Sequence, residues 1–173
     1  MAVGLSSAQR TYLVMVNQVL AAHPKWSYLD PAWIMTIMDI ESGYQPLVVN
    51  GTGRQDGLMQ VIPPTAQAMA SLYGIPAGPQ TDPMISINSG IGYLDDSARS
   101  IAKFRNVPSI PLWDLAQAYN EGFGAVEAWK MDPAYLAKFQ NELPIIEAQM
   151  EATAMLTNKP SFVPRGMRSV MPL

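Results

Sequence analysis

The spacing of apolar and polar residues along the chain predicts a series of amphipathic helices. Apolar residues recur at helical intervals in seven segments, which cover residues 7–23, 31–42, 63–73, 85–104, 111–119, 124–130 and 133–156. Runs rich in glycine, proline and polar residues separate these segments and predict loops. No segment alternates as a half-buried strand would, and no internal repeat is present. The predicted fold class is therefore mainly α.

Capping residues and prolines set the ends of several predicted helices. Asp30 followed by Pro31 is a typical helix start, because the aspartate accepts a bond from a free amide and proline needs no amide partner. Gly43 supplies the stop for the same helix. Pro144 lies inside the last helical segment and is expected to break or kink it.

One acidic residue interrupts the apolar face of the segment 31–42. Glu41 follows Met38, Ile37 and Ile34 at intervals of three, four and seven residues, which places all four on one side of a helix. Loss of hydration there would raise the pKa of the carboxyl and make Glu41 a candidate general acid. The alternative is that Glu41, close to the helix end, turns out to solvent. Asp39 points roughly 200° away and is assigned to a solvated face.

Length and composition predict one compact domain. The chain has 173 residues, of which 49% are hydrophobic and 14% charged, enough for a sizeable core. We assign residues 1–157 to a single domain. Residues 158–173 contain three prolines and three basic residues but no acidic residue, and they are predicted to form a basic tail.

Charge and residue counts exclude several classes of function. A net charge of −3 argues against a nucleic-acid binder, which usually carries a basic surface. With no cysteine and one histidine, disulfides, thiol chemistry and a zinc site are not expected, and neither a metal nor a cofactor is predicted. No apolar run approaches the length of a membrane span, and the N-terminal residues lack the pattern of a classical export signal.

Four motifs follow one another at comparable intervals: "ESGYQP", "DGLMQVIPPTA", "DPMISINSGIGYL" and "AYNEGFGAV", the last followed by Trp129. In this order they resemble the lytic transglycosylase family, which shares its fold with goose-type lysozyme and cleaves the glycan strands of bacterial peptidoglycan. The resemblance covers about residues 26–130. It implies a lysozyme-like helical domain with little or no β structure.

The resemblance assigns roles to individual residues. Glu41 matches the catalytic acid and base of the family, and Ser42 follows it as in the family's Glu-Ser pair. Gln60 ends the Gly-Leu-Met-Gln signature, whose glutamine lines the sugar cleft. Tyr119 matches the tyrosine that lies beside the catalytic carboxylate, and Asn120 follows it in the same motif. Asn120 is equally well explained as a helix cap or turn residue.

The chain departs from the family pattern at two positions and lacks one residue. Asn50 stands where many members have serine, and Ile62 replaces a common methionine. Asn50 still donates and accepts hydrogen bonds, so we retain it as a substrate-binding candidate. The acidic residue that grips the peptide stem has no secure counterpart after Trp129.

Two reaction outcomes are compatible with the sequence. The resemblance implies that Glu41 protonates the oxygen between N-acetylmuramic acid and N-acetylglucosamine, then activates the muramoyl 6-hydroxyl to leave a 1,6-anhydro end. That reaction needs no second carboxylate, unlike the usual glycosidases. If Asp56 instead reached across the cleft and positioned water, the chain would be a lysozyme-type hydrolase. An exposed loop aspartate is the simpler interpretation of Asp56.

A different class of function is a catalytically inactive structural component of a phage tail, an ejection machine or a secretion apparatus. The basic tail, residues 158–173, would contact such an assembly, and the protein would be virion-associated or delivered to the periplasm by a non-classical route. The joint presence of Glu41, Gln60 and Tyr119 argues against an inert protein.

Overall fold

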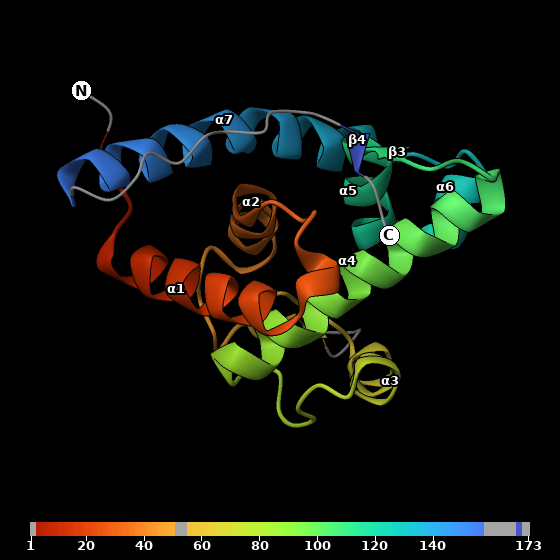
Figure 1. The fold of residues 1–173 in the computed structure, drawn as a ribbon, viewed down its shortest axis with the longest axis horizontal. Coiled ribbons are helices and arrows are strands. Elements are labelled where there is room, and N and C mark those ends of the chain that lie inside the picture. The colour runs from red at the N-terminus through yellow and green to blue at the C-terminus, as the bar shows by residue number, and fades with distance from the viewer. Residues whose placement is uncertain (1–2, 51–54, 158–168, 171–173) are drawn as a thin grey trace.

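The computed structural model describes residues 3–50, 55–157 and 169–170, and almost all of its regular structure is helical (Figure 1). The helices are α1 (Ser7–Ala22), the 3₁₀-helix η1 (Pro24–Trp26), α2 (Pro31–Ser42), α3 (Pro63–Tyr73), α4 (Pro83–Arg105), α5 (Leu112–Glu121), α6 (Phe123–Glu127) and α7 (Pro133–Leu156). Two antiparallel pairs of short strands join β1 (Val49–Asn50) to β2 (Gln55–Asp56) and β3 (Ile110–Pro111) to β4 (Ser169–Val170). The predicted mainly α class is confirmed.

Helix α2 lies in the middle of the molecule, between α1 and α7 (Figure 1). Ile34, Ile37 and Met38 are each at most 2% exposed, which confirms the apolar face that precedes Glu41. The remaining side chains of residues 32–38 are buried as well. Asp39 was assigned to a solvated face but is half-buried, and burial together with the charge of Glu142 on α7 raises its pKa. A helix enclosed on both sides has no fully solvated face at this point.

Both predicted ends of α2 are confirmed. The Asp30 carboxylate accepts a hydrogen bond of 2.9 Å from the amide of Ala32, and Pro31 occupies the first helical position. Gly43 ends the helix with a left-handed φ of 57°, a conformation that costs glycine little, and its amide bonds to the carbonyl of Asp39.

Helix α7 runs through Pro144 without a break. Proline has no amide to bond the carbonyl of Gln140, one turn earlier. Pro144 is exposed, so on the solvent side of the helix a water molecule can donate to that carbonyl in place of the missing amide. The expected break is therefore wrong, because tertiary packing of both halves of α7 outweighs the local loss of one hydrogen bond, whereas a kink at Pro144 stays a prediction.

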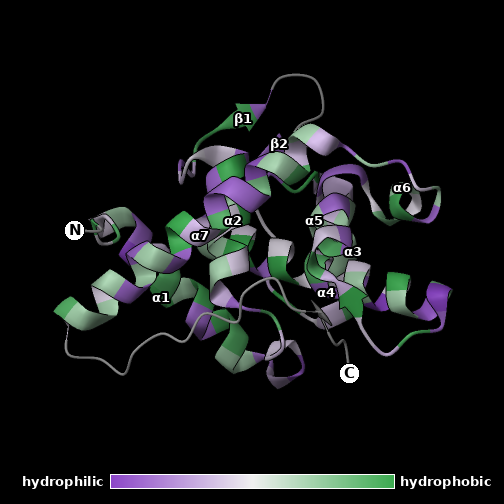
Figure 2. Cartoon of the chain, turned by 90° about the horizontal axis from the view of Figure 1, so that it is seen from above, coloured by the Kyte–Doolittle hydropathy of each residue, from purple (hydrophilic) through white to green (hydrophobic). Residues whose placement is uncertain are grey.

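The predicted loop between α2 and α3 contains a two-residue β-pairing. Val49 pairs with Asp56 and Asn50 with Gln55, and Figure 2 shows this hairpin at one edge of the molecule. Residues 51–54 lie outside the described residues. Most of the predicted tail, residues 158–168 and 171–173, lies outside them too, so its assignment as a separate segment stays a prediction.

Candidate active site

The carboxyl of Glu41 lies in the last turn of α2 and is held from α7. The hydroxyl of Tyr135 donates a 2.8 Å hydrogen bond to Oε1 of Glu41. Burial raises the pKa of the Glu41 carboxyl, while the bond from Tyr135 and the charge of Lys138 act in the opposite direction. Burial is the largest of these effects, so the acid form persists to higher pH than in an exposed glutamate.

Tyr135 is fixed by the helix start that precedes it. The Asp132 carboxylate caps α7 and accepts hydrogen bonds from the amides of Ala134 and Tyr135 at 2.9 and 3.2 Å. The tyrosine side chain is buried, and burial together with the neighbouring Glu41 raises its pKa. A raised pKa keeps the Tyr135 hydroxyl protonated, so that it can donate to the carboxyl.

The Gly-Leu-Met-Gln segment is fastened to three helices through its backbone. Ser42 of α2 has its hydroxyl 2.9 Å from the carbonyl of Leu58. The hydroxyl of Ser86 on α4 accepts from the amide of Met59 at 3.0 Å. Tyr119 of α5 donates to the carbonyl of Met59 at 2.6 Å. Ser42 is buried and faces the protein here, so the structure gives it a part in positioning this segment.

Gln60 adopts a rare backbone conformation for a non-glycine residue, with φ of 50°. Its side-chain amide donates to the carbonyls of Val48 and Gly57 at 3.1 and 2.7 Å. Its Oε1 accepts from Nδ2 of Asn50 at 2.8 Å. These bonds tie the hairpin to the Gly-Leu-Met-Gln segment and hold Gln60 in place. Strain of this kind is concentrated at functional sites.

Gln60, Tyr119 and Asn120 line one pocket of about 130 Å³. Its other lining residues include Gln55, Ile62, Thr65 and Tyr93. The pocket is smaller than a typical ligand site of roughly 300 Å³ or more, so it accommodates one group of a larger ligand. The structure thus brings together three of the predicted substrate-binding residues, and Asn50 joins them through its bond to Gln60.

Glu41 is a neighbour of this pocket through Tyr119. Burial raises the pKa of Tyr119 well above its ordinary value, and the charge of Glu41 is the next largest cause. The two side chains therefore lie within electrostatic reach of each other, although Glu41 does not line the pocket itself. The hydroxyl of Tyr119 itself is bonded to the carbonyl of Met59, and the predicted position of Tyr119 beside the carboxylate stays a prediction.

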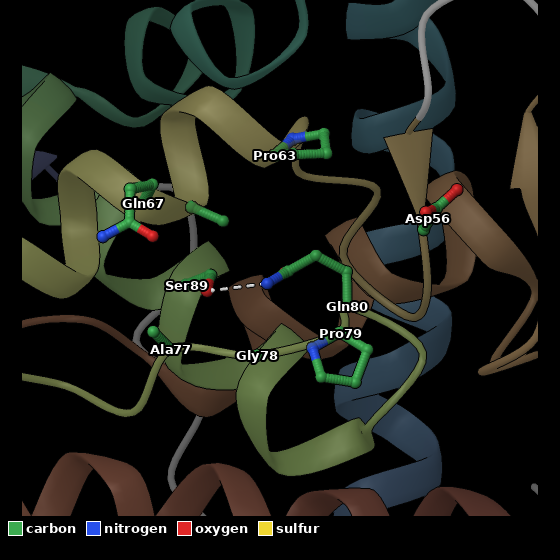
Figure 3. Close-up of a pocket in the computed structure, with 9 residues that line it drawn as sticks. Asp56, Pro63, Gln67, Ala77, Gly78, Pro79, Gln80 and Ser89 are labelled. Carbon is green, nitrogen blue, oxygen red and sulfur yellow. Dashed lines mark hydrogen bonds between the residues drawn. The ribbon is translucent and has the colours of Figure 1, made fainter.

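Asp56 lines a different pocket, which Figure 3 shows between the start of α3 and residues 77–80. Its neighbour Gln55 faces the pocket that contains Gln60 and Tyr119. The structure does not bring Asp56 into one pocket with the other predicted site residues.

Three residues with a part in this site were not singled out from the sequence. Tyr135 bonds Glu41, Lys138 lowers the pKa of that carboxyl, and Tyr93 lines the pocket with its ring 5.4 Å from that of Tyr119. Tyr93 stands in the motif "DPMISINSGIGYL", to whose residues no individual role was assigned. Tyr135 follows a clear helix start, but no local pattern indicates that this helix packs against α2.

Residues 3–50, 55–157 and 169–170, which the structure describes, contain neither a metal-binding cluster nor a membrane-spanning helix. In these ranges the acidic and histidine side chains form no group of three or more that could hold a metal ion. None of the helices there is both long and apolar enough to cross a bilayer.

Comparison with known proteins finds a protein family whose model matches this chain. The model of the Transglycosylase SLT domain matches residues 19–141. The chain is 29% identical over 140 residues to membrane-bound lytic murein transglycosylase C of Mannheimia succiniciproducens, which covers 78% of this chain and 38% of that protein. It is also 29% identical over 117 residues to the soluble lytic murein transglycosylase of Escherichia coli K12. This match covers 65% of this chain and 17% of that protein. The chain thus spans less than half the length of these relatives.

Two solved structures have a similar fold. An inactive mutant of the lytic transglycosylase Slt from Pseudomonas aeruginosa superposes with a TM-score of 0.58 at 19% identity, covering 92% of this chain and 26% of that one. The 70-kDa soluble lytic transglycosylase in complex with bulgecin A gives a TM-score of 0.56 at 19% identity, covering 91% and 26%. At these identities the likeness concerns the fold, and it confirms the predicted helical architecture.

Proposed function

Because this chain belongs to the transglycosylase SLT domain family, we propose that it cleaves the glycan strands of bacterial peptidoglycan as a lytic transglycosylase. The family match confirms the resemblance found in the motifs. The observation that carries the proposal is the carboxyl of Glu41, whose pKa is raised by burial and whose position is fixed by Tyr135. A carboxyl whose pKa is raised and whose position is fixed is suited to act as a general acid.

In the first step Glu41 acts as the acid. Tyr135 occupies Oε1, so the acidic proton resides on Oε2 and passes to the oxygen that links N-acetylmuramic acid to N-acetylglucosamine. The bond between that oxygen and C1 of the muramoyl residue then breaks. The N-acetylglucosamine end departs as an alcohol, and Glu41 is left as a carboxylate.

In the second step the carboxylate acts as the base. It takes the proton of the muramoyl 6-hydroxyl while O6 bonds to C1, which closes a 1,6-anhydro ring. Glu41 is protonated again, and no water is consumed. A single carboxyl suffices for both steps, which is consistent with the position of Asp56 in a separate pocket.

Gln60, Tyr119 and Asn120 bind the sugar in this proposal. Their pocket accommodates one polar substituent of a ring, and the buried ring of Tyr119 forms part of its wall. Asn120 donates to Glu121 and Asp132, each at 3.2 Å, so its amide is oriented before a ligand arrives. Gln60 has its polar atoms engaged within the protein and shapes the wall of the pocket.

Digestion of purified peptidoglycan followed by mass analysis of the muropeptides tests the proposal. We expect 1,6-anhydro ends from the parent protein and a loss of roughly 10²–10⁴-fold in rate for Glu41→Gln, which keeps the shape but not the proton. Glu151→Gln, on α7, is a matched control and should cleave like the parent. Reducing ends without anhydro products would identify a hydrolase. Equal cleavage by Glu41→Gln would exclude the catalytic role and favour a structural component.

Delivery to the cell wall is a separate part of the proposal. We propose that a phage particle or a secretion apparatus carries the protein, because residues 158–173 are basic and rich in proline. Detection of the protein in purified particles tests this route. Its absence from particles of a phage that encodes it would exclude virion association.

A further inference from the structure

Trp129 lies just beyond the end of α6 with most of its surface in water, and the proposed chemistry does not use it. It is 76% exposed, whereas Trp26 and Trp33 are buried. One exposed apolar residue is ordinary on a protein surface. The backbone conformation of Trp129 and the cation over its ring are not ordinary, and both keep the ring in one place.

The backbone holds Trp129 in a conformation that usually belongs to glycine. Its φ is 55°. The amide of Trp129 bonds to the carbonyl of Val126 at 3.2 Å, and the amide of Lys130 bonds to the carbonyl of Ala125 at 2.9 Å. These two bonds are those of a Schellman helix end, where glycine is the commonest residue because a left-handed φ strains a bulky side chain. Strain of this kind is concentrated at functional sites.

An ion pair orients the ring of Trp129. The guanidinium carbon of Arg105, at the end of α4, lies over the ring at 5.1 Å from its centroid. Arg105 also bonds the carboxylate of Asp114 on α5, and Asp114 is only 4% exposed. A cation over an aromatic face is attracted by the ring, and the buried carboxylate keeps this cation in position. One face of the ring is therefore covered, and the exposure of the residue leaves the other face to solvent.

The segment that carries Trp129 also contacts the pocket of Gln60 and Tyr119. Three residues after Trp129, the Asp132 carboxylate accepts a 3.2 Å hydrogen bond from Asn120, which lines that pocket. Three residues of chain span at most about 11 Å, so the backbone of Trp129 lies near the pocket. The pocket of about 130 Å³ holds only one group of a larger ligand, and the remainder of that ligand needs contacts outside it.

We propose that the open face of Trp129 stacks on a sugar ring of the glycan strand, outside the pocket. The faces of a pyranose ring present C–H groups that pack on an aromatic ring, while its hydroxyl groups point outward to water. A protein partner would also use an exposed tryptophan, but the bond between Asp132 and Asn120 joins this segment to the sugar pocket and favours the glycan. This inference rests on the proposed function, because it adds a contact to the same substrate.

Isothermal titration calorimetry with N-acetyl-chitohexaose tests this contact, with N-acetyl-chitobiose as the short probe. Neither probe has a muramoyl residue, so the proposed reaction does not consume it. Trp129→Gly removes the ring and suits the left-handed φ, so this variant should fold. We expect it to bind the hexamer about tenfold more weakly, the scale of losing an aromatic contact in a binding surface, and to bind the dimer like the parent.

Further variants separate stacking from simple apolar contact. Trp129→Phe keeps an aromatic face and should retain most of the affinity for the hexamer, whereas Trp129→Leu should lose it as Trp129→Gly does. Trp113→Ala is the matched control, because Trp113 is also exposed but lies in the first turn of α5, about 10 Å along the helix from Asn120. It should bind both probes like the parent. Thermal unfolding of each variant verifies that it is folded.

An unchanged affinity of Trp129→Gly for the hexamer would overturn the proposal and leave a protein as the partner of the exposed ring. Full affinity in Trp129→Leu, or an equal loss in Trp113→Ala, would also overturn it. Formation of anhydro ends by the parent, with hexamer binding independent of Trp129, would refute this inference alone. Hexamer binding that depends on Trp129, without anhydro ends, would refute only the proposed reaction.

Discussion

Two opposing interactions set the proton affinity of Glu41. Burial favours the neutral acid and raises the pKa, whereas the hydroxyl of Tyr135 and the charge of Lys138 favour the carboxylate. In the proposed reaction the carboxyl must be protonated at the start and charged halfway through. A donor that stabilises the charged form therefore assists the second step, while burial prepares the first.

Tyr135→Phe should displace the pH dependence of cleavage. Removing a donor to the carboxylate raises the pKa of Glu41 further, so the decline of activity on the alkaline side should move to higher pH. Rates on a soluble peptidoglycan fragment across the pH range measure this shift. Tyr12→Phe, on α1, should leave the alkaline decline of activity at the same pH as in the parent. If the activity of Tyr135→Phe declined at the same alkaline pH as that of the parent, the hydroxyl would not affect the pKa of Glu41.

At the scale of elements, helix α4 supports the Gly-Leu-Met-Gln segment through a close contact at Gly90. A Cβ built on Gly90 would lie 2.6–2.8 Å from Cε, Cβ and Cγ of Met59. The carbonyl of Met59 in turn accepts the bond from Tyr119. The smallness of Gly90 thus determines how near the site segment approaches α4.

Gly90→Ala should destabilise the protein by about 1–3 kcal/mol, the usual cost of overpacking a core. It should also lower cleavage, because Met59 and Tyr119 move together. Where a helical glycine has free space around it, the same change to alanine instead stabilises the protein by up to about 1 kcal/mol. Gly124→Ala on α6 is the control, since nothing lies within 4 Å of its Cβ position. Urea unfolding of both variants measures the contrast, and equal effects would contradict the close contact.

At the scale of the whole molecule, one buried carboxylate joins segments that are distant in sequence. Asp95 on α4 is fully buried and accepts bonds of 2.7 Å from the hydroxyls of Tyr28 and Tyr73 and from Nε of Arg99. Tyr28 lies between η1 and α2, and Tyr73 ends α3. This network ties the residues just before α2, the helix of Glu41, to α3 and α4, which contribute Thr65 and Tyr93 to the pocket of Gln60 and Tyr119.

Tyr28→Phe and Tyr73→Phe should each destabilise the fold by about 1–3 kcal/mol, because each leaves a buried carboxylate oxygen with one donor fewer. The double variant should differ from the sum, since both hydroxyls serve one carboxylate. Urea unfolding gives the four free energies. Ser71→Ala removes an exposed hydroxyl bonded only within α3 and should be near neutral. Strict additivity would indicate that the network does not act as a unit.

The features that were predicted from the sequence are local ones. The ends of α2 follow from Asp30, Pro31 and Gly43, whose effects reach no further than one helical turn. The failure at Pro144 marks the limit of such reasoning, because packing along α7 outweighed a local penalty. The half-buried state of Asp39 has the same origin, since it depends on what covers the helix.

The sequence by itself determined the helical class, the apolar surroundings of Glu41 and, through motifs, the family. These depend on the periodicity of apolar residues and on residue identity, both of which are properties of the linear sequence. Only the tertiary structure decided that Tyr135 bonds Glu41 across 94 residues, and that Asp56 and its neighbour Gln55 line different pockets. Such facts depend on which faces of distant helices meet, and burial and hydrogen bonding between them exist only after the chain has folded.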